Sequence, residues 1–178
     1  MEGNTTKADS VSTTCCSVDT TMLAVLVGIV ILHLTEIIIL IISTSVNAWR
    51  MAGAKSYDLW YNCETLNGGY HCIGASDADW LQAVQALMVL ATLFCMLSFI
   101  FFLCQLFTLA KGGRFLFTAV FQVLSSLFVM SGAIIYTVMS PDEPKTENSY
   151  GYAFVLAWLA FPLTLISGFI YIILRKKE

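Results

Sequence analysis

Four long apolar runs limit what this chain can fold into more than any other feature of its sequence. They are Met22 to Ile42, Ala86 to Ala110, Phe115 to Met139 and Ala153 to Leu174, and the last three contain no Asp, Glu, Lys, Arg or His. A helix needs roughly 20 apolar residues to cross about 30 Å of hydrocarbon. Because the hydrocarbon cannot satisfy free backbone N–H and C=O groups, such runs must be helices. The sequence therefore predicts an all-α membrane protein with four transmembrane helices.

Basic residues next to the helices predict the orientation of the chain. Lys111 and Arg114 lie between the second and third runs, and Arg175 to Lys177 follow the fourth. Positive charge marks the cytoplasmic side, so both termini should be cytoplasmic. We also expect a plasma-membrane protein that passes through the endoplasmic reticulum. The loops on the opposite side are acidic, which argues against nucleic acid as a partner and leaves the lipid bilayer as the evident one.

These features predict an organisation in nine segments. In order they are a disordered cytoplasmic extension (1–21), a first transmembrane helix (22–45), an extracellular loop (46–80), a second helix (81–110), a cytoplasmic turn (111–114), a third helix (115–139), a second extracellular loop (140–149), a fourth helix (150–174) and a cytoplasmic tail (175–178). The extension is rich in Ser and Thr and has no apolar periodicity. Its Cys15 and Cys16 are either palmitoylated or unmodified thiols, and translation starts at either Met1 or Met22.

The first extracellular loop contains the signals of a small β structure. Asn67-Gly68-Gly69 is typical of a hairpin turn, and Cys63 and Cys72 flank it in a loop that faces an oxidising compartment. We expect a disulfide, which by chain entropy would stabilise so short a loop by about 2–3 kcal/mol. A metal site that uses His71 with the two cysteines is the weaker alternative, because it lacks a fourth ligand.

Two polar residues, His33 and Glu36, lie one helical turn apart in the first apolar run. Ionisable residues inside a membrane are candidate functional sites. The pair is either a proton relay or a hydrogen-bonded, uncharged site inside the bundle, and the absence of charged residues from the other runs favours the second interpretation. Gln105 and Gln122 lie at similar depth around the 111–114 turn. An amide hydrogen bond that packs the two helices together is the favoured interpretation, and a polar pore lining is the weaker alternative.

The sequence gives little sign of catalysis. No nucleophile, base and orienting group can be assembled, and no residues indicate a cofactor or a metal, so a non-enzymatic protein is expected. Leu165, Tyr171 and Arg175 match a pattern proposed for cholesterol contact. The simpler interpretation of these residues is an aromatic belt with a basic anchor.

Trp49, then Leu59-Trp60, then Cys63 and Cys72, placed between the first two of four helices, resemble the W…LW…C…C signature of the claudin and peripheral myelin protein superfamily. The segments DLWYNC, WLQAVQA, FFLCQLFTLAKGGRF, IIYTV, SYGYAFVLAWLAFPL and YIILRKKE are similar to its peripheral myelin branch, with the epithelial membrane proteins next. The resemblance covers about residues 22 to 178.

The resemblance implies a left-handed four-helix bundle with an extracellular β-sheet, in which Trp49 and Trp60 seat the sheet against the membrane. It implies a structural role in compact myelin, through adhesion, cholesterol-rich domains and contact with myelin protein zero or self-association. It also links the chain to growth arrest and to cell junctions. The alternative is a claudin-like junction protein that forms a paracellular barrier or pore.

The chain departs from the family pattern at two positions of this loop. Glu64 stands where an N-glycosylation sequon at Asn62 needs Ser or Thr, so glycosylation is not carried over. Asp58 occupies the place of the glycine in the claudin GLW motif, which points away from the claudins proper.

Overall fold

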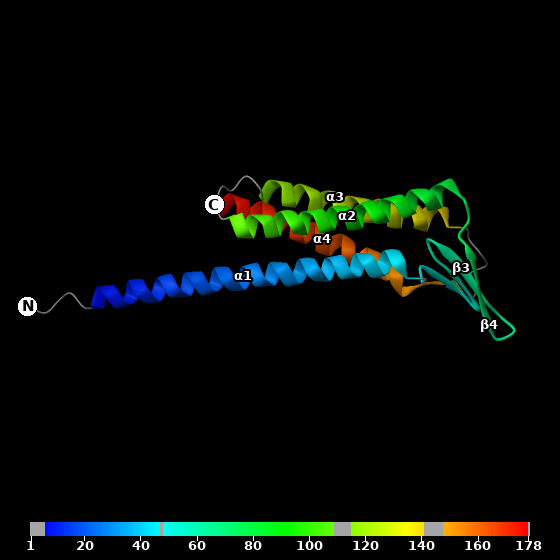
Figure 1. Cartoon of the computed structure of the whole chain (residues 1–178), viewed down its shortest axis with the longest axis horizontal. Helices are drawn as coiled ribbons and strands as arrows, with labels where there is room; N and C mark the ends of the chain where they lie inside the picture. Colours follow the sequence, from blue (N-terminus) through cyan, green and yellow to red (C-terminus); the bar gives the residue numbers. More distant parts are fainter. Residues whose placement is uncertain (1–5, 47, 109–114, 141–147, 178) are drawn as a thin grey trace, which may run out of the picture.

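The computed structural model describes residues 6–46, 48–108, 115–140 and 148–177. Four helices form an elongated bundle, and a small sheet lies across one of its ends, which we call the sheet end (Figure 1). The helices are α1 (Thr6–Ser45), α2 (Asp79–Thr108), α3 (Phe115–Met139) and α4 (Tyr152–Lys177). Each contains a stretch that is long and apolar enough to cross a membrane, namely Leu23–Ser45, Asp79–Phe107, Leu116–Met139 and Tyr152–Leu174. The prediction of four membrane-spanning helices is confirmed.

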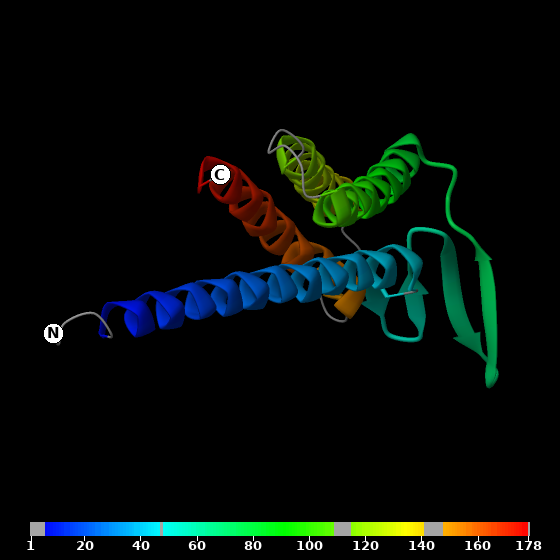
Figure 2. The ribbon, with the colours of Figure 1, turned by 60° about the vertical axis from the view of Figure 1, so that its left-hand side comes forward.

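The first helix begins earlier than predicted, and its N-terminal part extends beyond the rest of the bundle (Figure 2). α1 starts at Thr6, inside the segment 1–21 that the sequence predicts to be disordered. No Gly or Pro lies between Thr6 and Met22. The helix of the apolar span can therefore continue backwards, because extending a helix costs far less than nucleating one. The prediction of disorder is wrong for residues 6–21, whereas residues 1–5 and the side chains of Cys15 and Cys16 lie outside the described part.

The sheet has five antiparallel strands in the order β4-β3-β2-β1-β5. Four come from the first loop, namely β1 (Arg50–Ala52), β2 (Lys55–Tyr57), β3 (Tyr61–Leu66) and β4 (Gly69–Gly74). The fifth, β5 (Asn148–Tyr150), follows the third helix, where the sequence indicates only a turn-rich loop. β5 pairs with β1, so the sheet joins the two loops of the sheet end.

The predicted hairpin is present and is formed by β3 and β4. Asn67 and Gly68 have φ angles of 51° and 79°, as a two-residue turn with left-handed backbone requires. Cys63 and Cys72 are paired in the register of the two strands and form the expected disulfide. The bond therefore fixes the register of the hairpin.

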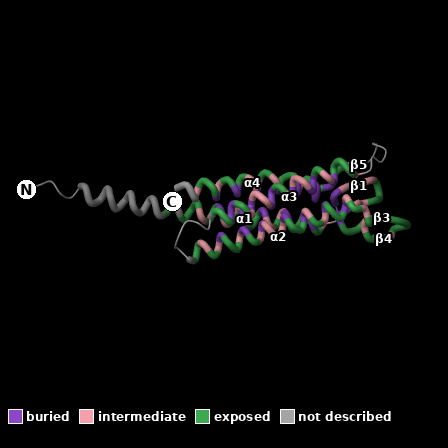
Figure 3. The backbone as a smooth tube through the Cα atoms, turned by 90° about the horizontal axis from the view of Figure 1, so that it is seen from above, coloured by how far each residue is buried: buried purple, intermediate pink, exposed green. Residues whose placement is uncertain are grey.

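Buried positions alternate with exposed ones along each helix of the bundle (Figure 3). Many of the buried residues are small or polar, and many large apolar residues are exposed. The Ser125 hydroxyl donates to the Ala91 carbonyl at 2.7 Å, which joins α3 to α2. A Cβ on Gly168 of α4 would lie only 2.9 Å from Cγ2 of Val123 of α3. Such close approaches are typical of membrane helices, where packing replaces the hydrophobic effect as the force between helices.

Candidate functional site

Two tryptophans attach the sheet to the end of α1. The indole Nε1 of Trp49 donates to the carbonyl oxygen of Ser43 at 2.7 Å, and Nε1 of Trp60 donates to that of Thr44, also at 2.7 Å. These two carbonyls belong to the last turn of the helix, where no intrahelical donor is available. The tryptophans thus cap the helix and hold the sheet on it.

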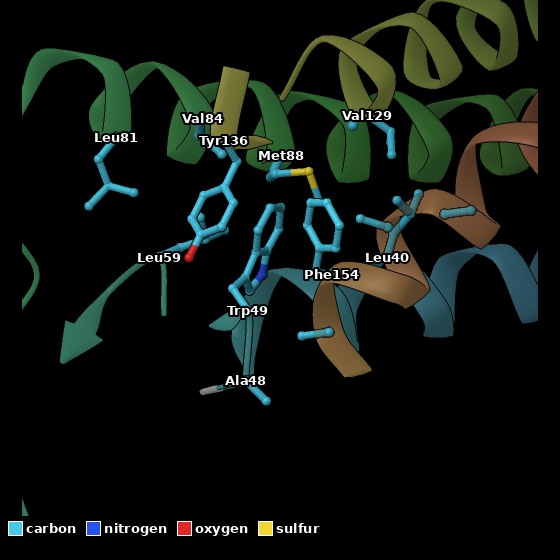
Figure 4. Packing of buried hydrophobic residues seen from close by; sticks show 14 of the residues in the cluster. Leu40, Ala48, Trp49, Leu59, Leu81, Val84, Met88, Val129, Tyr136 and Phe154 are labelled. Carbon is cyan, nitrogen blue, oxygen red and sulfur yellow. The ribbon is translucent and has the colours of Figure 1, made fainter. Parts of the chain in front are cut away.

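Trp49 also forms the centre of the core at the sheet end of the bundle (Figure 4). Its ring is fully buried, with ring centroids 4.7 Å from Tyr136 and 5.8 Å from Phe154. Leu59 is likewise fully buried, whereas Trp60 is 37% exposed. The signature residues therefore hold the sheet on the ends of the helices.

The start of α4 is joined to the chain just before β1. The backbone N–H groups of Gly151 and Ala153 donate to the carbonyls of Trp49 and Ala48 at 3.0 and 3.1 Å, respectively. The Ser43 hydroxyl donates to the Ala153 carbonyl at 2.8 Å. A Cβ on Gly151 would lie 2.0 Å from the Ala48 carbonyl oxygen, so this approach requires glycine. Together these contacts hold the sheet on α1 and α4.

The strand register assigns the sheet side chains to two faces. Met51, Ser56, Cys63 and Cys72 stand opposite one another in a single row across β1 to β4. Side chains alternate along a strand, so Tyr61, Thr65 and Tyr70 lie on the same face as this row. We call this face the outer face, because the neighbouring row points towards the helices.

The outer face exposes apolar surface without charge. Tyr61 is 53% exposed, Tyr70 62% and Met51 44%. The Tyr70 and Ser56 hydroxyls lie 3.3 Å apart, which places the Tyr70 ring across the sheet. The face is thus rigid, uncharged and rich in tyrosine, a composition typical of protein contact surfaces.

The opposite face covers a cleft of about 160 Å³ between the sheet and the ends of α2 and α3. We call it the inner cleft. Its wall on the sheet is the row Arg50, Tyr57 and Asn62, which are cross-strand partners. The complete lining is Arg50, Tyr57, Asp58, Asn62, Ser76, Trp80, Leu81, Tyr136 and Ser140.

Asp58 is a buried carboxyl group in the lining of the inner cleft. Asp58 is 2% exposed, and its Oδ2 accepts a hydrogen bond from the backbone N–H of Trp60 at 3.5 Å. Its Oδ1 has no hydrogen-bond partner among the described residues. Burial raises the pKa of Asp58 from 3.8 to about 6, while the backbone N–H groups of Leu59 and Trp60 lower it. At neutral pH the cleft therefore contains a poorly solvated negative charge.

A polar cluster in the membrane-spanning part connects α1 with the other three helices. Nδ1 of His33 lies 2.9 Å from the Tyr171 hydroxyl of α4, and Nε2 lies 3.1 Å from the Cys95 carbonyl of α2. A carbonyl can only accept, so in the neutral imidazole Nε2 carries the proton and Nδ1 accepts the tyrosine hydroxyl. Both ring nitrogens are thus satisfied by the protein.

Glu36 binds the third helix. Its Oε2 accepts a hydrogen bond from the amide of Gln122, and both residues are fully buried. The prediction of a hydrogen-bonded Glu36 is confirmed. The predicted Gln105–Gln122 pair is wrong, because the Gln122 amide donates to Glu36 of α1 and the Gln105 carbonyl oxygen has no partner within the described ranges. The sequence indicated no charged partner for His33 or Glu36, but their partners are uncharged: the hydroxyl of Tyr171 and the amide of Gln122.

Ligand atoms of His33, Glu36 and Cys95 lie within 4.8 Å of one another, close enough to consider a metal ion. A metal at His33 would have to displace a proton from Nε2 or the Tyr171 hydroxyl from Nδ1, since each nitrogen has its partner. Among the described residues this arrangement fits a hydrogen-bonded junction of four helices better than a metal centre.

The proposed cholesterol residues do not form one lipid-facing surface. Tyr171 is fully buried, with its ring centroid 5.5 Å from Phe102 and its hydroxyl at His33. Leu165 is half-buried, and the Arg175 side chain lies outside the described part. The prediction that Tyr171 contacts cholesterol is wrong, because burial removes this ring from the lipid.

Comparison with known proteins gives a family match over most of the chain. The family model described as PMP-22/EMP/MP20/Claudin matches residues 22–171. Epithelial membrane protein 2 of Danio rerio is 48% identical over 163 residues, which cover 88% of this chain and all of the relative. Epithelial membrane protein 3 of Homo sapiens is 42% identical over 153 residues, covering 83% of this chain and 94% of the relative. Epithelial membrane protein 2 of Bos taurus is 39% identical over 172 residues, covering 88% and 100%.

Proposed function

Because the chain belongs to the PMP-22/EMP/MP20/Claudin family, we propose that this multi-pass membrane protein organises contacts between membranes, without catalysis, in the manner of an epithelial family member. The names of the relatives favour the epithelial alternative over the myelin role expected first, and they do not point to myelin protein zero as a partner. The observation that carries the proposal is the rigid, uncharged outer face of the sheet.

The attachment of the sheet makes it suited to bear a contact. Its strands are fixed by the Cys63–Cys72 disulfide and by the two indole hydrogen bonds to α1. A surface that is already ordered loses little conformational entropy when it binds. The outer face can therefore use its exposed tyrosines for affinity.

We infer that the sheet faces the outside of the cell. A disulfide in the sheet is typical of an oxidising compartment. In the sequence, Lys111 and Arg114 lie between α2 and α3, and Arg175 to Lys177 end α4; both groups are at helix ends away from the sheet, as expected on the cytoplasmic side.

The partner we propose for the outer face is a second copy of this chain in the opposing membrane. Two identical faces repel each other when they carry net charge, but the outer-face residues Met51, Ser56, Tyr61, Thr65 and Tyr70 are all uncharged. The charged pair of the sheet, Lys55 with Glu64 at 3.3 Å, belongs to the opposite face by register. Like faces can therefore meet in a symmetric contact.

A two-colour cell-mixing assay tests this function. Cells that express the protein should cluster with one another, and the double variant Tyr61→Ser with Tyr70→Ser should abolish clustering at equal surface amount. Ile73→Ser is the matched control, because Ile73 is 70% exposed but lies on the opposite face by register. Undiminished clustering of the double variant at equal surface amount would refute the proposed contact.

The paracellular pore remains a second candidate because two exposed acids lie at the sheet end, Asp77 just before α2 and Asp79 at its first residue. Such acids could attract cations to a pathway between cells. Transepithelial conductance separates the two functions. A cation-selective conductance that Asp77→Asn with Asp79→Asn abolishes would favour the pore, and unchanged conductance would exclude it.

A further inference from the structure

The inner cleft has the size and position of a site for part of a lipid headgroup. Its volume is about 160 Å³, and an engineered apolar cavity of about 150 Å³ is large enough to hold benzene. Trp80 and Leu81 lie in the first turn of α2, while Tyr136 and Ser140 lie at the end of α3. The cleft thus lies where two membrane spans end, at the level of the headgroups on the sheet side.

The lining of the cleft favours an ammonium group. The rings of Trp80 and Tyr136 meet as a corner, with centroids 6.0 Å apart and planes inclined at 62°. Tyr57 lines the cleft from the sheet. Asp58 contributes a buried carboxyl group whose Oδ1 has no hydrogen-bond partner in the part of the chain that the structure describes. Aromatic walls next to a carboxylate are the usual environment of bound ammonium ions.

The burial of Asp58 distinguishes between kinds of ammonium. Its Oδ1 is shielded from solvent, so a primary ammonium in the cleft could not readily donate a hydrogen bond to it. A primary ammonium would therefore lose hydration without full replacement. A quaternary ammonium has no N–H group to satisfy and needs only aromatic surface and a nearby negative charge. The cleft therefore suits choline better than ethanolamine.

The positive charge of the lining indicates that the ligand carries an anionic group next to its ammonium. Arg50 lies in the same lining, where its Nη1 donates to the Ser140 hydroxyl at 2.7 Å. One guanidinium and one carboxylate in a single cleft match a zwitterion, in which a phosphate lies next to the ammonium. We propose that the inner cleft binds the phosphocholine headgroup of a lipid in the leaflet on the sheet side, with choline between the aromatic rings near Asp58 and phosphate near Arg50.

Native mass spectrometry of the full-length protein tests this site. The protein, purified in a maltoside detergent, is incubated with equal amounts of phosphatidylcholine, phosphatidylethanolamine and phosphatidylglycerol that carry identical acyl chains. We expect preferential retention of phosphatidylcholine, and we expect Asp58→Asn to lower its ratio to phosphatidylglycerol, which carries no ammonium group, about tenfold. Asp77→Asn is the control, because Asp77 is exposed and lies outside the lining.

A second variant keeps the test decisive if Asp58→Asn disturbs folding. Tyr57→Leu removes an aromatic wall at a half-buried position and should lower the same ratio. Equal retention of the three lipids by the wild-type protein, or unchanged ratios in both variants, would overturn the proposal. Retention of phosphatidylethanolamine equal to that of phosphatidylcholine would refute the selection of a quaternary ammonium.

Competition with soluble compounds identifies the source of the ligand and the role of the phosphate. Glycerophosphocholine should displace the retained lipid at lower concentration than choline chloride, because only the former can meet Arg50. Equal displacement by the two compounds would contradict the contribution of the phosphate. Binding of glycerophosphocholine without retention of phosphatidylcholine would refute a lipid as the occupant.

Discussion

Loss of either indole hydrogen bond should lower the free energy of unfolding, but by different amounts for Trp49 and Trp60, and this difference can be measured. Trp49→Phe and Trp60→Phe each remove one N–H donor from the last turn of α1 and leave one carbonyl without its partner. Both acceptor residues are buried, but the donor Trp49 is fully buried, whereas the donor Trp60 is 37% exposed. Water can replace the lost donor at Thr44 more readily than at Ser43.

The burial of each hydrogen bond sets the expected loss of free energy of unfolding. An unsatisfied buried carbonyl costs about 1–3 kcal/mol, and replacing the fully buried indole by a smaller ring adds about 1 kcal/mol of lost packing. Trp49→Phe should therefore lower the free energy of unfolding by about 2–4 kcal/mol. Trp60→Phe should lower it by about 0.5–1.5 kcal/mol, the net value of an ordinary hydrogen bond.

The thiol of Cys95 provides the assay, because it is fully buried in the bundle. In a background with Cys15, Cys16 and Cys104 replaced by Ser, a thiol-reactive dye reports unfolding through Cys95 alone. At about 2–4 °C per kcal/mol, the two variants should differ by several degrees in Tm. Trp158→Phe serves as the control, since this ring is 39% exposed on the outside of the bundle.

Equal shifts of Tm for Trp49→Phe and Trp60→Phe would refute the reasoning, because burial of the carbonyl would then not decide the cost. A shift for Trp158→Phe as large as that for Trp49→Phe would show that loss of any indole, and not of this cap, destabilises the protein.

Three further predictions concern thermal stability. The first two use the thiol assay, and the third uses circular dichroism, because the reactivity of a thiol itself depends on pH. Gly151→Ala should prevent stable folding, because its Cβ would lie 2.0 Å from the Ala48 carbonyl oxygen. Gly28→Ala should be tolerated, because a Cβ there would meet nothing within 4 Å among the described residues. Equal Tm values for the two variants would contradict the close approach. Glu36→Leu should cost about 0.5–2 kcal/mol by leaving the Gln122 amide unpaired, and Glu36→Gln should cost less, so a reversed order would count against the hydrogen bond. The pKa of Asp58 is about 6 in the folded protein and 3.8 in its usual range. The folded state therefore holds this proton more tightly than the unfolded state. In lipid-free detergent the wild type should lose on the order of 2–3 kcal/mol of stability as pH rises from about 4 to above 6. Asp58→Asn should flatten that dependence, and parallel pH profiles of the two proteins would exclude Asp58 as its cause.

The features predicted correctly from the sequence are those set by local chemistry. Uninterrupted apolar runs must be membrane helices whatever their neighbours do. Asn67 and Gly68 accept the left-handed backbone of a tight turn, and the cysteines that flank this turn meet once the hairpin forms. None of these features depends on how the helices are rotated.

The features missed depend on rotation and on distant contacts. The spans are apolar on all sides, so no periodicity indicates that Gln122 turns towards Glu36 and away from Gln105. β5 forms only because α3 and α4 bring its three residues beside β1. The ring of Trp49 lies between Tyr136 and Phe154, a contact that the sequence alone does not reveal.

Clustering of vesicles that contain only this protein tests the central claim most directly. Two populations of proteoliposomes with donor and acceptor dyes should approach each other when both carry the wild-type protein. They should stay apart when either carries Tyr61→Ser with Tyr70→Ser, and Ile73→Ser should cluster normally. Wild-type vesicles that remain dispersed, or double-variant vesicles that cluster as well as the wild type, would contradict a contact through the outer face.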